Sequence, residues 1–317
     1  MKRLFTFTLL IFATLSLSAA EQEVMIDCPW GKLCGTLLSP EKGSETVALF
    51  IAGSGPTDRN GNSKLGLTTN SFIYLAEGLE QSGIASLRYD KRGVGASHLD
   101  LLKAMENGVF EDYINDATAA VNYLKAQGFK KIFLIGHSEG SLIALCVARH
   151  TPAVTGVVSL AGAGYTLDEI IQLQLAAQLA TTDLSLLLTA TSILHSLKQG
   201  ILVKEYPPVL AGLFNPSVQP FLISQLKYDP QQVIRAVTCP VLIINGDNDL
   251  QISVDNANAL KTAKPQAELL IIKEMTHVLK SSDQRDLQGQ LLGVYMNTSQ
   301  HLSDPLIPAI TRFIHSL

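Results

Sequence analysis

Residues 136–140 place a serine where a folded chain could expose it as a nucleophile. The stretch reads GHSEG and separates two apolar runs. The run at 131–135 is short, β-branched and aromatic, which favours a buried strand, and the run after Gly140 favours a buried helix. The flanking glycines let the two elements close tightly around a strained corner. The pattern therefore predicts a strand-to-helix corner that lifts the Ser138 hydroxyl out of the sheet.

This G-x-S-x-G pattern between strand and helix resembles the nucleophile elbow of the α/β-hydrolase family. A second segment, YDKRGVGAS at 89–97, is similar to the D-x-R-G-x-G-x-S segment of many members. From about residue 44 to the end, the chain is most similar to the serine aminopeptidase-like (S33-type) group of esterases and lipases. The resemblance implies an α/β fold with a mostly parallel eight-stranded sheet, helices on both faces and an inserted helical cap. It also implies that Asp90 and Arg92 brace loops.

A serine hydroxyl becomes a strong nucleophile only when a base takes its proton and a third group orients that base. In the family the chain order is serine, acid, histidine. Residues 245–252 are similar to the G-x-x-D-x-x-(V/I) acid loop, which implies Asp249 as the acid, with Asp247 as the alternative. Among seven histidines, only His277 directly follows a late expected strand, so it is the expected base. The elbow histidine, His137, is expected to point away from the serine.

Two backbone N–H groups should bind the negative charge that develops on the substrate oxygen. One is expected from Glu139, directly after the nucleophile at a helix N-terminus. The family resemblance places the other in the loop after the expected strand TVALFIA, where Ser54 is the candidate and Gly55 the alternative. In the same loop Asp58 and Arg59 are expected to brace the backbone, and substrate contact is the alternative.

The elements that must position these residues alternate between strand and helix. Strands are expected at 23–28, 33–38, 46–52, 84–89, 131–135, 155–161, 241–244 and 267–272, and helices at 71–81, 110–127, from 139 onward, at 254–262 and at 305–315. This order indicates a parallel sheet with right-handed crossovers. The stretch between the sixth and seventh strands is helical and proline-broken, which is typical of a cap. The predicted organisation is a signal peptide at 1–20, a core at 21–165, a helical cap insertion at 166–237 and the rest of the core at 238–317.

The N-terminus has the pattern of a secretory signal. Lys2 and Arg3 precede an apolar stretch at 4–17, and small residues follow up to Ala20, the expected cleavage point. The apolar stretch is shorter than the roughly 20 residues of a spanning helix. We therefore expect a secreted or periplasmic protein without a stable membrane anchor.

Four cysteines are available for an oxidising compartment. Cys28 and Cys34 flank PWGKL in an expected hairpin, so a disulfide between them is predicted. Cys146 and Cys239 are expected to be ordinary core residues. No CxxC pair and no His/Cys cluster has metal-ligand spacing, so we expect neither a metal nor another cofactor.

Composition limits the partners. The 317 residues carry a net charge of −4 and no long basic run, so nucleic acid is not an expected partner. The expected function is that of an exported serine hydrolase that cleaves small-molecule carboxylic esters through an acyl-enzyme intermediate. A substrate with an extended acyl chain is an open option.

Three alternative functions remain open. The first is an aminopeptidase, which would need carboxylates to hold a free amine, and the cap offers few: Asp168, Glu169, Asp183 and Glu205. A thioesterase acting on coenzyme A esters is disfavoured by export, because that substrate is cytosolic. The third alternative is a binding protein on a hydrolase scaffold that has lost catalysis.

Overall fold

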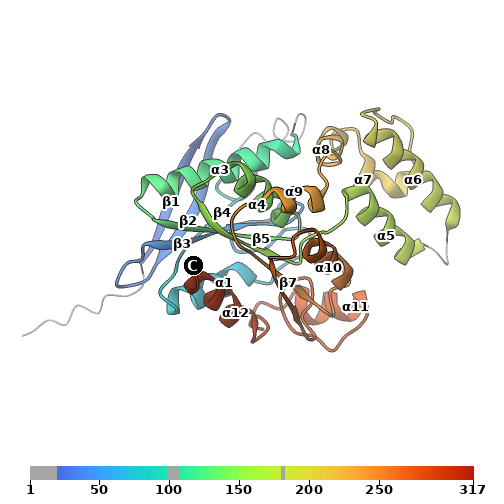
Figure 1. The fold of residues 1–317 in the computed structure, drawn as a ribbon. Helices are drawn as coiled ribbons and strands as arrows, with labels where there is room; N and C mark the ends of the chain where they lie inside the picture. The colour runs from blue at the N-terminus through green and yellow to red at the C-terminus, as the bar shows by residue number, and fades with distance from the viewer. Residues whose placement is uncertain (1–19, 99–107, 180–182) are drawn as a thin grey trace, which may run out of the picture.

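The computed structural model describes residues 20–98, 108–179 and 183–317, so almost all of the predicted signal peptide lies outside the described residues. Its centre is one eight-stranded sheet of order β1-β2-β4-β3-β5-β6-β7-β8 (Figure 1). The strands are β1 (Ala20–Cys28), β2 (Gly31–Ser39), β3 (Thr46–Ile51), β4 (Ala85–Tyr89), β5 (Lys131–His137), β6 (Val154–Leu160), β7 (Val241–Gly246) and β8 (Glu268–Ile272). The β1–β2 and β2–β4 pairs are antiparallel and the others are parallel. The predicted mostly parallel sheet is confirmed.

Helices cover both faces of the sheet. One face is covered by α3 (Phe110–Ala126), α4 (Glu139–His150), α9 (Pro230–Ala236) and α10 (Val254–Ala263), and the other by α1 (Ser71–Gln81) and α12 (Leu306–His315) (Figure 1). Strand β3 shows how the sequence specifies these layers. Its residues Val47 and Leu49 pack on the first face. Phe50, the residue after Leu49, packs on the second. Buried side chains alternate because a strand repeats every two residues.

The helical cap lies between β6 and β7 and stands at one side of the sheet (Figure 1). It consists of α5 (Leu167–Leu179), α6 (Leu184–Lys198), a 3₁₀ turn (Pro208–Leu210), α7 (Ala211–Phe214) and α8 (Gln219–Gln225). Their apolar side chains form a cluster of their own, which includes Leu194, Phe214 and Leu222. Within the described ranges, no helix has both the length and the apolar character that crossing a bilayer requires.

Helix α9 lies within the range predicted for the cap insertion, 166–237, but it packs with the core. Its residues Val233 and Ile234 belong to the main core cluster and not to the cap cluster. The reason is topological, since parallel neighbours such as β6 and β7 need a crossover helix packed on the sheet. Helix α9 is that crossover, and the cap is inserted before it.

The hairpin of β1 and β2 contradicts the predicted disulfide. Cys28 lies opposite Gly31, and Cys34 lies opposite Met25, because the turn has only two residues. Cys34 is therefore three positions beyond the partner of Cys28, an offset of about 10 Å that also puts the two side chains on opposite faces. Both thiols are free.

The long loop after β8 contains helical structure that the sequence did not suggest. A short helix, α11 (Leu287–Gln290), continues into one turn of π-helix (Leu291–Tyr295). Val294 and Tyr295 of this segment pack against Val278 and form a small apolar cluster. This segment therefore packs against the loop that carries His277.

Candidate active site

Ser138 occupies the corner between β5 and α4 with a strained backbone. Its φ of 54° and ψ of −121° lie in a region that residues with a side chain rarely adopt. The adjacent glycines are required by close packing. A Cβ on Gly136 would lie 2.2 Å from the Gly140 carbonyl oxygen, and one on Gly140 would lie 2.1 Å from the Ile51 carbonyl oxygen. The chain thus has the sharp corner that the sequence predicts.

His277 and Asp249 lie in contact. His277 Nδ1 is 2.8 Å from Asp249 Oδ2, and the Asp249 side chain is fully buried. The other carboxylate oxygen accepts hydrogen bonds from the N–H groups of Gln251, at 2.8 Å, and Ile252, at 2.9 Å. Asp247, the alternative acid, instead accepts a hydrogen bond from the Glu274 N–H. The structure therefore brings Asp249, and not Asp247, to the histidine.

The His277 loop is a tight turn with its own anchor. Both the N–H and the hydroxyl of Thr276 donate to the Lys280 carbonyl, and Leu279 has a left-handed backbone with φ of 67°. The Lys280 ammonium group is buried and donates to the carbonyls of Thr69, at 2.7 Å, and Asn297. Burial lowers the pKa of Lys280 to about 8. Nothing in the spacing of the sequence singled out this lysine.

His137 contacts the backbone of the candidate base. Its Nε2 lies 2.8 Å from the His277 carbonyl oxygen, and the two imidazole rings are 4.9 Å apart. Burial lowers the pKa of His137 to about 4, and repulsion from His277 adds to the effect. The side chain is thus neutral near pH 7 and its Nε2–H donates to the carbonyl, so it holds the His277 loop in place.

The loop after β3, which carries the candidate oxyanion donor Ser54 and is here called the candidate oxyanion loop, approaches the elbow closely. A Cβ on Gly53 would lie only 3.0 Å from the Ser138 Cβ. The Ser54 hydroxyl donates to Glu139 Oε2 at 3.2 Å, while the Ser54 N–H has no acceptor among the described residues. Glu139 is the first residue of α4, so its N–H has no acceptor within the helix. Both candidate donors therefore flank the serine.

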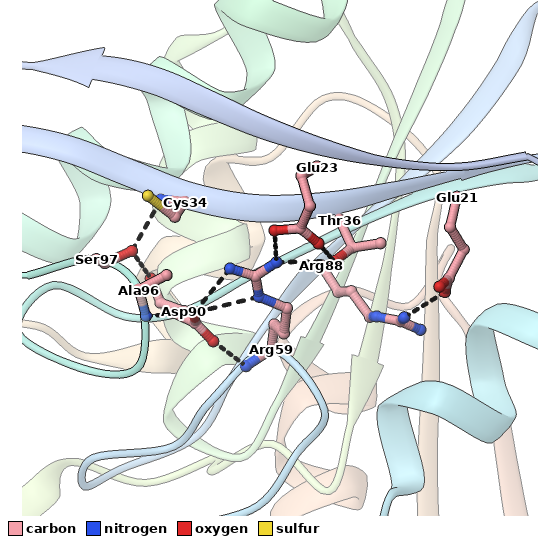
Figure 2. A network of polar contacts seen from close by, with 9 residues as sticks. All are labelled: Glu21, Glu23, Cys34, Thr36, Arg59, Arg88, Asp90, Ala96 and Ser97. Carbon is pink, nitrogen blue, oxygen red and sulfur yellow. Dashed lines mark hydrogen bonds and ion pairs between the residues drawn. The ribbon is translucent and has the colours of Figure 1, made fainter.

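The same loop is braced by the polar network in Figure 2. Asp90 accepts hydrogen bonds from the Arg59 backbone, the Arg59 guanidinium and the Ala96 N–H. Arg59 also pairs with Glu23 on β1 and donates to Thr36 on β2. Arg59 and Asp90 therefore connect the candidate oxyanion loop, the hairpin and the segment after β4.

Asp58 and Arg92 also hold loop segments in place. Asp58 accepts hydrogen bonds from the N–H groups of Asn60 and Asn62, which closes its own loop. Arg92 pairs with Asp116 on α3 at 2.7 Å. The contacts of Asp58, Arg59, Asp90 and Arg92 are thus those of loop bracing.

These groups face one cavity of about 820 Å³ between the sheet and the cap. Its described lining includes Ser54, Ser138, Glu139 and His277, and apolar side chains such as Leu142, Ile170, Leu213, Phe221 and Leu222. Within the described ranges, no group of three or more His, Cys, Asp and Glu side chains is gathered as metal ligands would be.

The charged side chains of the described lining are paired. Lys91 pairs with Glu139 at 3.3 Å, and Arg92 pairs with Asp116. Gln225 on α8 also lines the cavity and is 6% exposed, and its side-chain amide has no hydrogen-bond partner among the described residues. The sequence pattern did not single out Lys91 and Gln225, because a lysine after a strand and a glutamine in a helix are both common.

The sheet, the elbow after β5 and the inserted helical cap define an α/β-hydrolase. Many solved structures share this fold, and two serve as examples. Est1E from Butyrivibrio proteoclasticus has a TM-score of 0.58 and 18% identity, with 94% of this chain and 98% of that chain covered. The Pyrococcus furiosus esterase Pf2001 has a TM-score of 0.60 and 17% identity, with 95% of this chain and 92% of that chain covered.

Sequence comparison narrows the class to a family. The serine aminopeptidase (S33) family pattern matches residues 65–283, more than half of the chain, and the chain belongs to this family. Esterase EstD of Thermotoga maritima is 26% identical over 290 residues, which are 89% of this chain and 65% of the relative. The chain thus spans less than two thirds of that relative's length.

Proposed function

We propose that this chain is a carboxylesterase in which Ser138, His277 and Asp249 form the catalytic triad. The observation that carries the proposal is the 2.8 Å contact between His277 Nδ1 and the buried Asp249 carboxylate, beside a cavity that Ser138 also lines. Asp249 fixes the tautomer that keeps Nε2 free to accept a proton. A relative named an esterase agrees with this activity.

The reaction proceeds in two halves. Ser138 Oγ attacks the ester carbonyl while His277 Nε2 takes its proton, and the oxyanion is bound by the N–H groups of Ser54 and Glu139. Collapse of the intermediate breaks the ester bond, and the leaving alcohol takes the proton from His277. Water then attacks the acyl-enzyme with His277 as base, which releases the carboxylic acid and regenerates the serine.

The cavity favours an uncharged, largely apolar substrate. Every charged residue in the described lining already has a partner, and the rest of the wall is mainly apolar. An aminopeptidase would need a carboxylate free to bind an amine. Of the predicted candidates, Asp168 pairs with Lys198 and Asp183 caps α6. None of the four lines the cavity.

We further propose that the protein is secreted or periplasmic. The support is the N-terminal pattern of two basic residues, an apolar stretch and small residues up to Ala20. Expression of the full chain with sequencing of the mature N-terminus tests this. A start at Glu21 in the exported fraction would support export, and an intact N-terminus on protein retained in the cytoplasm would contradict it.

The decisive experiment measures hydrolysis of p-nitrophenyl esters of increasing acyl length, together with labelling by a fluorophosphonate. We expect turnover and labelling to disappear in Ser138→Ala. Ser141→Ala is the matched control, because Ser141 lies three residues away in the first turn of α4, bonds to Ser159 and does not line the cavity. Turnover of aminoacyl p-nitroanilides without turnover of esters would favour an aminopeptidase. Absence of both turnover and labelling would favour a binding protein.

A further inference from the structure

Lys91, in the segment after β4, is a buried cation that contacts the candidate oxyanion loop after β3. Its ammonium group donates to the Gly53 carbonyl at 2.8 Å and pairs with Glu139 Oε1 at 3.3 Å. It also lies 4.5 Å from the centre of the Tyr113 ring, a favourable cation–π distance. The side chains of Lys91 and Glu139 are only 6% and 5% exposed. This ion pair lines the cavity directly beside Ser138.

The contact with Gly53 determines the direction of the Ser54 N–H. The Gly53 carbonyl and the Ser54 N–H belong to one planar peptide group, and the described chain has no cis peptide bond. In a trans peptide the C=O and the N–H point in opposite directions. Anchoring the carbonyl on Lys91 therefore prevents the Ser54 N–H from rotating. Glycine at 53 would otherwise leave this peptide unusually free to rotate.

Glu139 connects the same lysine to the second donor. One carboxylate oxygen of Glu139 accepts from Lys91, and the other accepts from the Ser54 hydroxyl at 3.2 Å. The backbone N–H of Glu139 is itself the other candidate oxyanion donor. The ion pair thus fixes both donor segments relative to each other.

A stabilising role alone does not account for this pair. Two buried charges cost desolvation energy that their attraction offsets only in part, so apolar residues of similar volume often stabilise a protein as well or better. Preorganised donors, in contrast, are a main source of transition-state stabilisation.

We propose that Lys91 is a positioning residue that holds the Ser54 N–H in the oxyanion hole. The proposal rests on the esterase function proposed above. Lys91 does not touch the reacting atoms. It acts through the Gly53–Ser54 peptide and through Glu139.

The first test variant is Lys91→Met, which keeps the length of the side chain and removes its donors. We expect kcat for a p-nitrophenyl ester to fall by about 10- to 100-fold, somewhat less than for complete loss of one oxyanion donor. KM should change by less than about threefold, because the interaction strengthens in the transition state. The double variant Lys91→Met/Glu139→Gln removes the buried carboxylate that the single variant leaves unpaired, and it should show the same loss.

A transition-state analogue separates positioning from a general structural defect. An alkyl trifluoromethyl ketone adds to Ser138 and places an oxyanion in the hole, whereas the parent methyl ketone binds without forming one. Affinity for the fluorinated ketone should fall by the same factor as kcat/KM, and affinity for the methyl ketone should not change. Arg88→Met is the control, since the Arg88 side chain is buried to a similar extent, at 7% exposed, pairs with Glu21 and does not line the cavity.

Three outcomes would overturn the proposal. In the first, the folded double variant retains wild-type kcat. In the second, kcat falls but the affinity for the fluorinated ketone is unchanged. In the third, Arg88→Met lowers kcat and fluorinated-ketone affinity as much as Lys91→Met does. A wild-type protein that hydrolyses no ester and resembles Ser138→Ala would instead refute the esterase function, and the role of Lys91 with it.

Discussion

Two aspartates only two residues apart have different surroundings. The Asp249 side chain is fully buried, and its two oxygens accept hydrogen bonds from His277 and from backbone N–H groups. Asp247 is 38% exposed on its side chain and bonds to the backbone of Glu274. The first can orient a histidine, and the second holds a turn.

This difference gives a direct comparison of matched variants. Asp249→Asn should lower kcat by up to about 10⁴-fold, because an amide presents a donor to His277 and favours the wrong tautomer. Asp247→Asn should change kcat by less than about tenfold, as expected for a turn residue. Steady-state hydrolysis of one p-nitrophenyl ester by both variants measures this. Equal losses would contradict the assignment of Asp249.

His137 should make the stability of the protein depend on pH. Burial lowers its pKa from 6.5 to about 4. Between these values the unfolded chain binds a proton that the folded protein does not. The folded state therefore loses stability as the pH falls through this window, and the contribution is fully retained above it.

His137→Gln removes this titration. From about pH 7 to about pH 5, the free energy of unfolding should fall by about 2 kcal/mol less in the variant than in the wild type. Urea denaturation at the two pH values measures the difference. The exposed His150, changed to Gln, is the control. A wild type and a His137→Gln variant with the same pH dependence would contradict the prediction.

At the residue scale, features set by neighbouring residues could be predicted from the sequence, whereas contacts between distant residues could not. The glycines around Ser138 could be recognised because the motif is contiguous. At each of them a Cβ would lie about 2 Å from a carbonyl oxygen. The contact of Lys91 with Gly53 joins positions 38 residues apart, and no periodicity reports it. Long-range polar pairs depend on the final packing, so they become visible only in the structure.

At the scale of elements, Arg59 connects the first hairpin to the candidate oxyanion loop (Figure 2). Its side chain is 12% exposed and pairs with Asp90, which is 5% exposed. The strand β1 and the loop after β4 thus meet at one guanidinium group. Its removal would leave the Asp90 carboxylate buried without its cation.

Arg59→Met should lower the free energy of unfolding by about 3 kcal/mol, as is typical when one partner of a buried pair is removed. Lys32→Met should have no measurable effect, because Lys32 and Asp27 form a solvent-exposed pair on the same hairpin. Urea denaturation measures both variants. An Arg59 variant as stable as the Lys32 variant would show that the network is not structural.

Helix α8 offers a second prediction, which concerns specificity. Gln225 presents to the cavity a side-chain amide that bonds to no other described residue, so the amide is open to a bound substrate. Substrates that supply a hydrogen bond should therefore be preferred. Gln225→Leu should lower kcat/KM for p-nitrophenyl esters of ω-hydroxy acids relative to plain alkyl esters by about tenfold. A series of chain lengths measures the ratio, and a ratio that is unchanged across the series would contradict the role.

The hairpin shows why element positions were easier to predict than registers. The two strands were expected at 23–28 and 33–38, and β1 and β2 include both ranges. The disulfide was wrong because the turn is two residues long, which moves Cys34 opposite Met25. A small error in turn length changes every cross-strand pair, whereas it leaves the strand assignment intact.

At the scale of the whole molecule, the apolar interior of the cap is separate from that of the sheet and its helices. The sheet and its helices share two large clusters, whereas the cap has its own smaller cluster. The sequence indicated the cap because helical patterns replaced strands there. It did not indicate where the cap ends, because α9 has the same helical pattern as the cap and only the sheet topology assigns it to the core.

The cap should open at a lower free-energy cost than the sheet. Local stability follows the number of buried apolar contacts, and those of α6 are limited to the cap. Amide hydrogen exchange should therefore be faster in Leu184–Lys198 than in the central strands Thr46–Ile51 and Lys131–His137. Equal protection in these segments would show that cap and core open as one unit.

The position of the cap before its crossover helix also bears on how such proteins diversify. Helix α9 completes the connection between β6 and β7, so the segment before it can change in length and sequence without breaking a strand pair. Insertions and recombination at this point would alter the wall of the cavity and leave Ser138, Asp249 and His277 on an unchanged scaffold. One ancestral core could therefore have acquired many substrate preferences by exchanging a single contiguous stretch of gene.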